Sequence, residues 1–216
     1  FTATATREVK DDIAETLRLQ DPEVVITGFD RPKLYYRVEP TRRKDAFVAD
    51  YVRSHPGESG IIYCATRKNV DAVQEMLQGE GFAAARYHAG MTNEERRQSQ
   101  NDFIYDAAPV IVATNAFGMG IDKSNVRYVI HYNMPQSMEN YYQEAGRAGR
   151  DGLPSQCILL FSPQDIMINR FLLEHKEVDD LDDEAAELLR ERDNQRLQAM
   201  ANYCQTTGCL RNYILR

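Results

Sequence analysis

Segments with the pattern of β-strands alternate with segments with the pattern of helices along most of this chain, and this alternation limits the fold more than any other feature. The strand-like segments are short and rich in β-branched and aromatic residues. The expected strands are 24–29, 34–38, 60–65, 82–88, 109–114, 126–133 and 155–161, and the expected helices are 7–19, 41–53, 69–78, 92–105, 137–148 and 164–175. Alternation of this kind builds parallel sheets. We therefore predict an α/β fold with a doubly wound, mostly parallel sheet.

Two local signals support these boundaries. Thr92 and Glu95 have the spacing of a capping box, in which each side chain accepts a hydrogen bond from a backbone N–H at the start of a helix. Asp30, Arg31 and Pro32 separate the first two expected strands and are residues typical of a turn. The capping box thus supports the expected helix 92–105, and the turn residues support the first two strands.

The charge of the chain is concentrated in one window. The formal net charge is -7, and residues 174–193 hold ten acids and three bases, which is the whole excess. We interpret this window as a solvated helix face or a linker. Beyond it, Leu197 and Met200 lie on the apolar side of an amphipathic helix that is expected to open a second unit. Because the remainder of the chain is neutral, any basic surface for a nucleic acid must be local.

Several classes of protein are disfavoured by composition. No uninterrupted apolar stretch is long enough for a membrane span, and the first residues lack the order of a secretory signal. Cys64 and Cys157 sit inside apolar runs, as expected for buried thiols in a reducing compartment. We expect a soluble, intracellular protein with no membrane partner, located in the cytoplasm, or in the nucleus if eukaryotic. Since the chain does not begin with Met, we also expect it to be part of a longer protein.

Three expected strands are followed directly by small and polar residues. These exits are 65–67, 87–90 and 114–120, with the sequences ATR, YHAG and TNAFGMG. The carboxyl ends of parallel strands lie at one edge of the sheet, where ligands of such folds bind. Hydroxyl groups and glycines allow a phosphate backbone to approach closely, and one arginine supplies charge. Each exit alone could be an ordinary turn, but together they predict a track for nucleic acid.

The segment 143–152, QEAGRAGRDG, is the most informative in the chain. Glycine costs about 1 kcal/mol inside a helix, so Gly146 and Gly149 suggest close approach to a ligand. Arg147 and Arg150 are three residues apart and are expected to share a helix face. Two guanidinium groups there could bind one triphosphate. The alternative is a surface helix end with ordinary arginines.

The chain lacks the motifs of a self-sufficient nucleotide enzyme. It contains no Gly-Lys pair and therefore no phosphate-binding P-loop. Gly118 and Gly120 are followed by Lys123 where a dinucleotide fingerprint has its third glycine, which disfavours a nicotinamide dehydrogenase. An arginine pair without a P-loop suggests a site completed in trans, with the phosphate cradle on another domain.

Six segments together resemble the RecQ DNA helicases of superfamily two. In chain order they are FTATAT, DRPKLYYRV, GIIYCATR, YHAGM, VIVATNAFGMGIDKSNVRYVIHYNMP and QEAGRAGRDG. The resemblance covers essentially the whole chain. It implies a RecA-like P-loop NTPase fold of the second helicase domain at 29–178, preceded at 1–28 by the end of a first RecA-like domain and a linker. Residues 179–216 would begin a helical zinc-binding region that is truncated here.

The resemblance also implies roles for individual residues. Arg150 would be the arginine finger on the γ-phosphate of ATP, with Arg147 assisting and Gln143 coupling the site. Asp122 and Gly120 would lie near the nucleotide, although some relatives carry Asn in place of Asp122. The residues expected to contact the DNA backbone are Thr66, Arg67, His88, Gly90 and Thr114. ATP and Mg²⁺ would be shared with the first domain in cis, and the motor would move 3′ to 5′ along single-stranded or partially duplex DNA.

The carboxyl end, NYCQTTGCLRNYIL, is similar to the start of the RecQ zinc-binding region. Cys209 would be the first of four thiolate ligands, and Leu210 departs from the basic residue that relatives often carry. A structural zinc site needs four ligands, so we expect Zn²⁺ in the full-length protein and not in this chain. Cys204 is interpreted as a small core residue.

Two alternatives remain open from the residues alone. An RNA helicase of the same superfamily would share the two-domain core. The Asp-Arg-Pro sequence at residues 30–32, where the second domain begins, and the segment that contains Cys204 and Cys209 favour RecQ. A non-catalytic nucleic-acid-binding module would keep the fold without the motor, although the presence of Arg147 and Arg150 argues against it.

Overall fold

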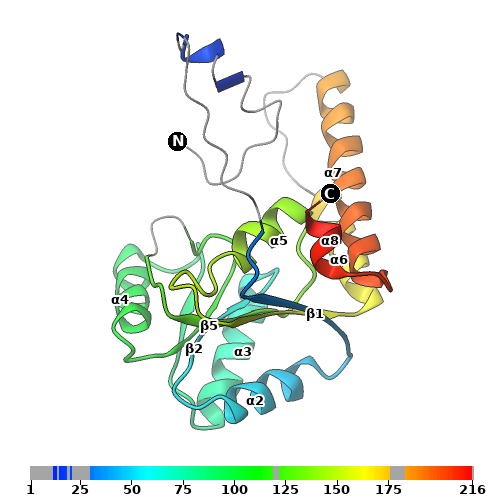
Figure 1. Cartoon of the computed structure of the whole chain (residues 1–216). Helices are drawn as coiled ribbons and strands as arrows, with labels where there is room; N and C mark the ends of the chain where they lie inside the picture. The colour runs from blue at the N-terminus through cyan, green and yellow to red at the C-terminus, as the bar shows by residue number, and fades with distance from the viewer. Residues whose placement is uncertain are drawn as a thin grey trace. The chain divides into compact units, whose positions relative to one another are not determined.

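Six parallel strands form the sheet that organises the chain from Pro32 onward (Figure 1). The structure is a computed structural model that describes residues 12–13, 15–18, 20, 30–118, 122–175 and 183–215. The strands are β1 Leu34–Pro40, β2 Ser59–Tyr63, β3 Ala84–Tyr87, β4 Val110–Ala113, β5 Val126–His131 and β6 Ser155–Phe161. Their order across the sheet is β1-β6-β5-β2-β4-β3, and every pairing is parallel. The predicted α/β class is confirmed.

The chain divides into two units, Phe1–Arg31 and Pro32–Arg216. In the first unit the described residues include a short helical stretch around 12–16. The expected strand 24–29 and the segment 1–6 lie outside the described residues. All further observations concern the second unit.

Helices connect the strands much as the sequence predicts. They are α2 Lys44–Ser54, α3 Arg67–Gly79, α4 Asn93–Ile104, α5 Met138–Ala145, α6 Pro163–Glu174, α7 Asp183–Gln205 and α8 Leu210–Ile214. The capping box at α4 is present, since Thr92 Oγ1 accepts from the N–H of Glu95 at 3.2 Å and Glu95 accepts from the N–H of Thr92 at 2.7 Å. No helix among the described residues is long and apolar enough to cross a bilayer.

Alternating side chains of the buried strands supply two cores, one on each face of the sheet. Ile61 and Tyr63 of β2 face the cluster that includes residues of α4, α5 and α7, whereas Ile62 of β2 faces the cluster built with α2 and α3. Figure 1 shows α2 and α3 on one side of the sheet and α5 to α8 on the other. The sheet is therefore covered by helices on both faces, as predicted.

The helical end of the chain packs on this sheet. Leu197, Met200 and Tyr203 of α7 are buried in the same core as β1, β5 and β6. The Tyr203 hydroxyl donates to the hydroxyl of Tyr141 on α5 at 3.3 Å. The amphipathic pattern correctly predicted the buried side of α7. This side packs on the core of the sheet, whereas the sequence suggested that the helix opens a second unit.

We predict that Gly60→Ala destabilises the protein. A Cβ at Gly60, in β2, would lie 1.9 Å from Cε2 of Tyr128, whose ring is fully buried. Overpacking of this kind costs about 1–3 kcal/mol. Urea unfolding should show the loss for Gly60→Ala, while Gly79→Ala, where a Cβ meets nothing within 4 Å, should be neutral or stabilising. Equal stability of the two variants would contradict the prediction.

Candidate nucleotide and nucleic-acid interface

The three polar strand exits lie at one edge of the sheet, as the parallel topology requires. β2, β4 and β3 are consecutive neighbours, so the exits 65–67, 114–118 and 87–90 follow adjacent strands. The N–H of Thr114 donates to the carbonyl of Tyr87 at 3.1 Å. A Cβ at Gly90 would lie 3.2 Å from Cδ of Arg67, which places these two exits in contact. The predicted track is therefore continuous across three strands.

The first exit leads into the amino end of α3. Thr66 is the N-cap residue, and its hydroxyl oxygen accepts from the N–H of Asn69 at 3.2 Å. Arg67 and Lys68 follow at the surface. The backbone N–H groups of a first helical turn attract anions, and two basic side chains strengthen that field. The exit after β2 is thus suited to a phosphate group.

The second exit is shaped by a buried histidine. His88 is 7% exposed, its Nδ1 accepts from the N–H of Gly90 at 3.2 Å, and its Nε2 lies 3.1 Å from Oδ1 of Asp71. An Nδ1 that accepts requires the proton on Nε2, which then donates to the carboxylate. Both ring nitrogens are engaged within the protein, so His88 supports the loop that presents Gly90.

The segment that carries Arg147 and Arg150 is not helical. This corrects the expected helix 137–148 and the expectation that the two arginines share a helix face. α5 ends at Ala145, so Gly146 is its C-cap and Gly149 lies in the following turn with φ +57°. A Cβ at Gly149 would lie 2.8 Å from the carbonyl oxygen of Leu153. Glycine is needed there by the turn itself. Arg147 and Arg150 consequently do not share a helix face, because they belong to a turn.

Arg147 points into the protein. Its Nη1 donates to the carbonyl of Gly118 at 2.6 Å, and a Cβ at Gly118 would lie 2.1 Å from its Nη2. Burial raises the pKa of the neighbouring Tyr63, and the Arg147 guanidinium opposes that rise. The hydroxyl of Tyr63 in turn donates to the carbonyl of Phe117 at 3.1 Å. Arg147 and Tyr63 therefore hold the loop after β4 against the turn after α5.

Arg150 points outward. Its side chain is 39% exposed, and Nη1 lies 4.0 Å from Oδ1 of Asp122, which is 97% exposed. The turn that carries it is fixed by Asp151, whose carboxylate accepts from Arg127 at 2.6 Å. The Arg127 guanidinium also holds the pKa of Asp151 below its ordinary value. Arg150 is thus an accessible cation on a braced turn.

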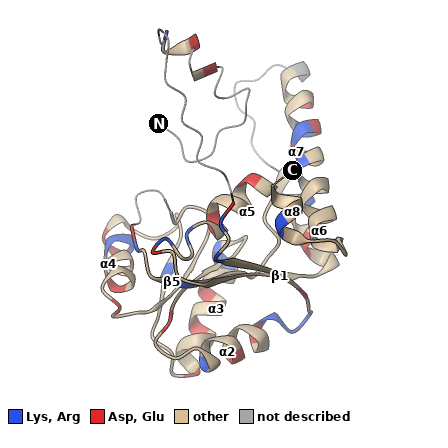
Figure 2. Cartoon of the chain, viewed as in Figure 1, with Lys and Arg blue, Asp and Glu red and all other residues tan. Residues whose placement is uncertain are grey.

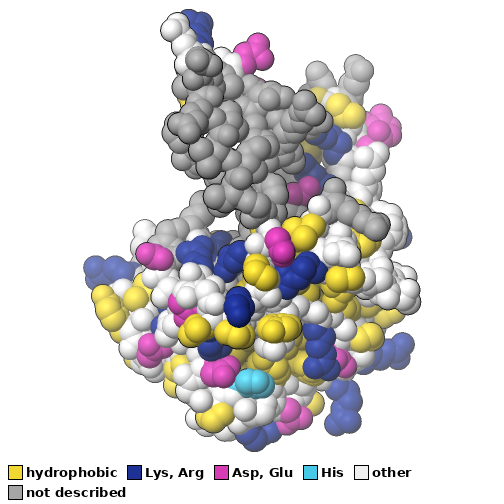
Figure 3. Space-filling model, viewed as in Figure 1, with side chains coloured by type: hydrophobic (Ala, Val, Ile, Leu, Met, Phe, Trp, Pro, Cys, Tyr) yellow, Lys and Arg dark blue, Asp and Glu magenta, His cyan; other side chains and the backbone are white. Residues whose placement is uncertain are grey.

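Of the two remaining residues predicted to lie near the nucleotide, the structure describes Gln143 alone. Gln143 is exposed on α5, one turn before Arg147. Gly120 lies outside the described residues. Figure 2 shows basic residues on the loops near α5, and Figure 3 shows Lys and Arg side chains interspersed with Asp and Glu on the visible face.

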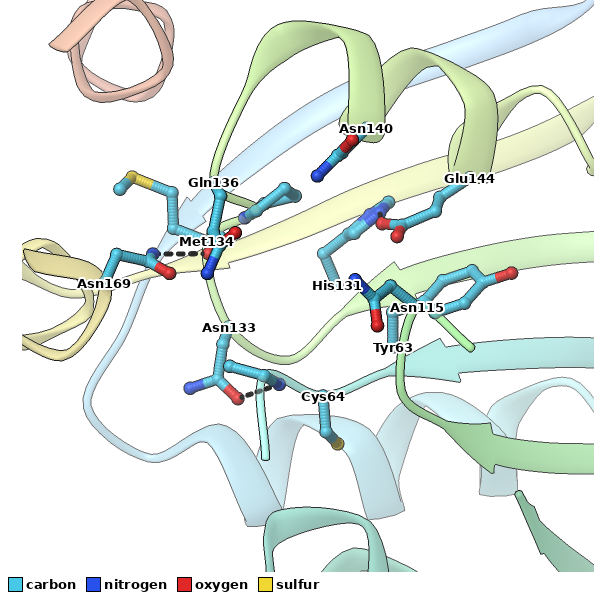
Figure 4. Close-up of a pocket in the computed structure, with 12 residues that line it drawn as sticks. Tyr63, Cys64, Asn115, His131, Asn133, Met134, Gln136, Asn140, Glu144 and Asn169 are labelled. Carbon is cyan, nitrogen blue, oxygen red and sulfur yellow. Dashed lines mark hydrogen bonds and ion pairs between the residues drawn. The ribbon is translucent and has the colours of Figure 1, made fainter. Parts of the chain in front are cut away.

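A small polar cavity lies where the chain order of the sheet reverses, between β5 and β2. α3 leaves β2 on one face and α5 leaves β5 on the other, which is where open α/β sheets bind ligands. The cavity has a volume of about 70 Å³ and is lined by Tyr63, Asn115, His131, Gln136, Asn140 and Asn169, among others (Figure 4). His131 Nε2 lies 2.9 Å from Oε2 of Glu144, and its ring stacks on Tyr63. The sequence carries no motif that singles out His131.

The cysteines follow the predictions made from their surroundings. Cys64, Cys157 and Cys204 are buried, and burial raises the pKa of Cys204 to about 12. Cys209 is exposed and is the N-cap residue of α8. Within the described ranges, no group of three or more His, Cys, Asp or Glu could hold a metal ion. The described residues therefore offer Cys209 as a single exposed thiol and no complete zinc site.

Comparison with known proteins identifies the family. Residues 43–152 match the family described as helicase conserved C-terminal domain, and residues 163–216 match RecQ zinc-binding. The ATP-dependent DNA helicase RecQ of Bacillus subtilis is 48% identical over 215 residues, which cover 100% of this chain and 35% of that protein. This chain belongs to the RecQ helicase family.

Other RecQ relatives also match over the full length of this chain. The RecQ helicase of Pasteurella multocida is 40% identical over 216 residues and 33% of its own length, and the RecQ-like DNA helicase BLM of Xenopus laevis is 40% identical over 220 residues and 16% of its length. The chain thus spans about a third of the bacterial RecQ proteins it matches.

The fold is shared more widely. A structure of Saccharomyces cerevisiae Dbp5 bound to RNA and ADP BeF3 superposes with a TM-score of 0.66 at 18% identity, over 91% of this chain and 54% of that one. At this identity the similarity concerns the fold alone. It confirms the RecA-like helicase architecture expected for a RecQ motor domain.

Proposed function

We propose that this chain is the second motor domain of a RecQ-type, ATP-dependent DNA helicase that moves 3′ to 5′ and acts in replication, recombination and repair. The observation that carries the proposal is the arrangement of the turn after α5. Arg147 fastens this turn to Gly118, and Arg150 extends from it into solvent beside Asp122. A braced, outward arginine on a chain without a P-loop is suited to complete a nucleotide site in trans.

In this proposal Arg150 neutralises charge on the γ-phosphate of ATP, and Arg147 keeps the turn in place. Gln143, Asp122 and Gly120 lie around the same nucleotide. The P-loop and the ligands of Mg²⁺ belong to a first RecA-like domain in cis, with residues 1–28 as its end and linker and residues 29–178 as the second domain. ATP would draw the two domains together, and hydrolysis would separate them.

DNA would lie across the three strand exits. In the proposal Thr66, Arg67, Gly90 and Thr114 contact phosphates, which their position at adjacent strand exits supports, while His88 shapes the loop around Gly90. Contacts of this kind bind the DNA backbone without reading sequence. The substrate is single-stranded or partially duplex DNA, encountered in the cytoplasm of a bacterium or the nucleus of a eukaryote.

The helical end at 179–216 would begin the zinc-binding region. We propose Cys209 as one Zn²⁺ ligand, because it is the exposed thiol of this segment, whereas Cys204 is buried with a raised pKa. Such an ion would supply structural stability and no catalytic step.

The proposal is tested with the gene product that carries this chain. Purified protein should hydrolyse ATP slowly, and single-stranded DNA should raise the rate of hydrolysis. The protein should also unwind a duplex with a 3′ tail in preference to one with a 5′ tail. Absence of DNA stimulation would overturn the motor assignment in favour of a binding module. Stimulation by RNA in place of DNA would overturn the choice of substrate.

The 216-residue chain by itself should behave differently. We expect it to bind a single-stranded oligonucleotide and to show no ATP hydrolysis above background, because it contains no P-loop. A phosphate-release assay beside fluorescence anisotropy measures both properties. Robust turnover by this chain alone would contradict the assignment of Arg150 to a site shared with another domain.

A further inference from the structure

Asn133 spans the crevice between β5 and β2. It follows β5, is 7% exposed, and its Oδ1 accepts two hydrogen bonds, from the N–H of Ala65 and from Nδ2 of Asn69, both at 3.1 Å. Figure 4 shows this side chain reaching the backbone beyond Cys64. Ala65 and Asn69 flank the amino end of α3, where Thr66 and Arg67 present the proposed phosphate site.

The other end of the same amide is held by a buried ion pair. Nδ2 of Asn133 donates to Oδ1 of Asp165 on α6 at 3.1 Å. Asp165 is 1% exposed, and both of its oxygens accept from Nζ of Lys44, at 2.7 and 2.8 Å. The same carboxylate accepts from the N–H of Ser162 at 2.7 Å and so begins α6. One side chain thus connects the loop after β2 to α2 and α6.

The chemistry of these contacts fixes the amide in one orientation. Oδ1 faces two N–H donors, and Nδ2 faces an oxygen of a carboxylate that is paired with Lys44. A flipped amide would place donors against donors and an acceptor against the carboxylate. Since the group is buried and bonded on both sides, any displacement of α6 moves the loop that carries Thr66 and Arg67 or breaks hydrogen bonds in a dry environment.

We infer that Asn133 is a positioning residue for the DNA contacts at the amino end of α3, and that it couples them to α6. The inference rests on the proposed motor function. α6 is the first helix within the segment that matches the RecQ zinc-binding family. Through Asp165 and Asn133, α6 sets the affinity of the second domain for DNA without touching DNA.

The test measures ATP hydrolysis by the gene product that carries this chain while the concentration of an oligo-dT strand is varied. Asn133→Ala removes the hydrogen bonds from Ala65 and Asn69 at the start of α3. At about 1 kcal/mol for each bond, the DNA concentration for half-maximal stimulation should rise about 30-fold. The rate at saturating DNA and the KM for ATP should stay unchanged, because the turn of Arg150 is not altered.

Asn169→Ala is the matched control. Asn169 is 1% exposed on α6, and its Nδ2 donates to the carbonyl of Met134 at 2.8 Å, next to Asn133. It loses a buried hydrogen bond in the same region but none to residues 65–69. Both variants should melt at a lower temperature than the unsubstituted protein. Only Asn133→Ala should need a higher DNA concentration for half-maximal stimulation of ATP hydrolysis. A merely structural role for Asn133 would make the two variants alike.

Asn69→Ala is the second variant, since it removes one of the two contacts at a half-buried position and leaves the Ala65 contact in place. Its half-maximal DNA concentration should rise about fivefold. If Asn133→Ala does not fold, an unchanged value in Asn69→Ala overturns the inference. An unchanged value in folded Asn133→Ala overturns it directly, while the motor proposal stands. An unsubstituted protein that does not respond to DNA overturns both.

Discussion

Replacing Arg150 with alanine is expected to reduce DNA-stimulated ATP hydrolysis about 1,000-fold while ATP binding survives. Arginine fingers contribute about 10³ to 10⁵ to turnover, because they stabilise charge that develops on the γ-phosphate in the transition state. The exposure of Arg150 and the turn braced by Asp151 and Arg127 support the proposal that Arg150 acts in this way. The measurement is steady-state phosphate release at saturating DNA, with nucleotide binding followed by a fluorescent ATP analogue.

Two further variants sharpen this prediction. Arg150→Lys keeps the charge but loses the planar fork, so its rate should remain far below that of the unsubstituted protein. Arg97→Ala removes an arginine of α4 whose side chain is 72% exposed and forms an ion pair with the exposed Glu94, and its rate should be unchanged. A loss of less than tenfold in Arg150→Ala would remove Arg150 from the nucleotide site.

Lys44→Met is expected to lower the free energy of unfolding by about 3–5 kcal/mol. The Lys44 side chain is 10% exposed and that of Asp165 is 1% exposed, and removal of one partner leaves the other charge buried and unpaired. The carbonyl of Tyr132 also loses the donor that Nζ provides at 2.8 Å. Urea unfolding of this chain, followed by circular dichroism, measures the loss.

The double variant Lys44→Met with Asp165→Asn provides the control. The amide carries no charge and its Oδ1 can still accept a hydrogen bond at the start of α6, so part of the stability should return. The loss in the single variant should also exceed that of Arg97→Ala, because an exposed pair contributes about 1 kcal/mol or less. A single variant as stable as the unsubstituted chain would show that the charge of Asp165 is not buried in solution.

Some of the residues on which these predictions depend lie in a recognisable sequence pattern, and others do not. Arg150 belongs to a segment that stands out, since two arginines and two glycines alternate over a few positions. Lys44 and Asp165 carry no such signal. Asn133 lies within the segment from Val110 to Pro135 that resembles RecQ helicases, but nothing in that segment indicates its contacts with Asn69 and Asp165, which are tens of positions away. Ser162 and Asp165 do have the spacing of a capping box, which could have marked the start of α6.

The sequence by itself determined the fold class and the common edge of the strand exits. Short apolar segments rich in β-branched and aromatic residues, joined by helical ones, predict a parallel sheet, and parallel strands connected in this way end on the same side whatever their order. The expected helix 137–148 ends earlier, at Ala145, and Gly146 and Gly149, which we interpreted as allowing close approach to a ligand, form the turn after α5. Spacing alone cannot reveal that Gly149 takes a positive φ, because a Cβ there collides with residues that pack only in the folded state.

Only the tertiary structure decided which way the functional side chains face. Arg147 and Arg150 have nearly the same neighbours in sequence, yet one binds the carbonyl of Gly118 and the other reaches solvent. His88 was expected to contact DNA, and both of its ring nitrogens are engaged inside the protein. Side-chain direction depends on partners contributed by distant segments, and local periodicity carries no information about those partners.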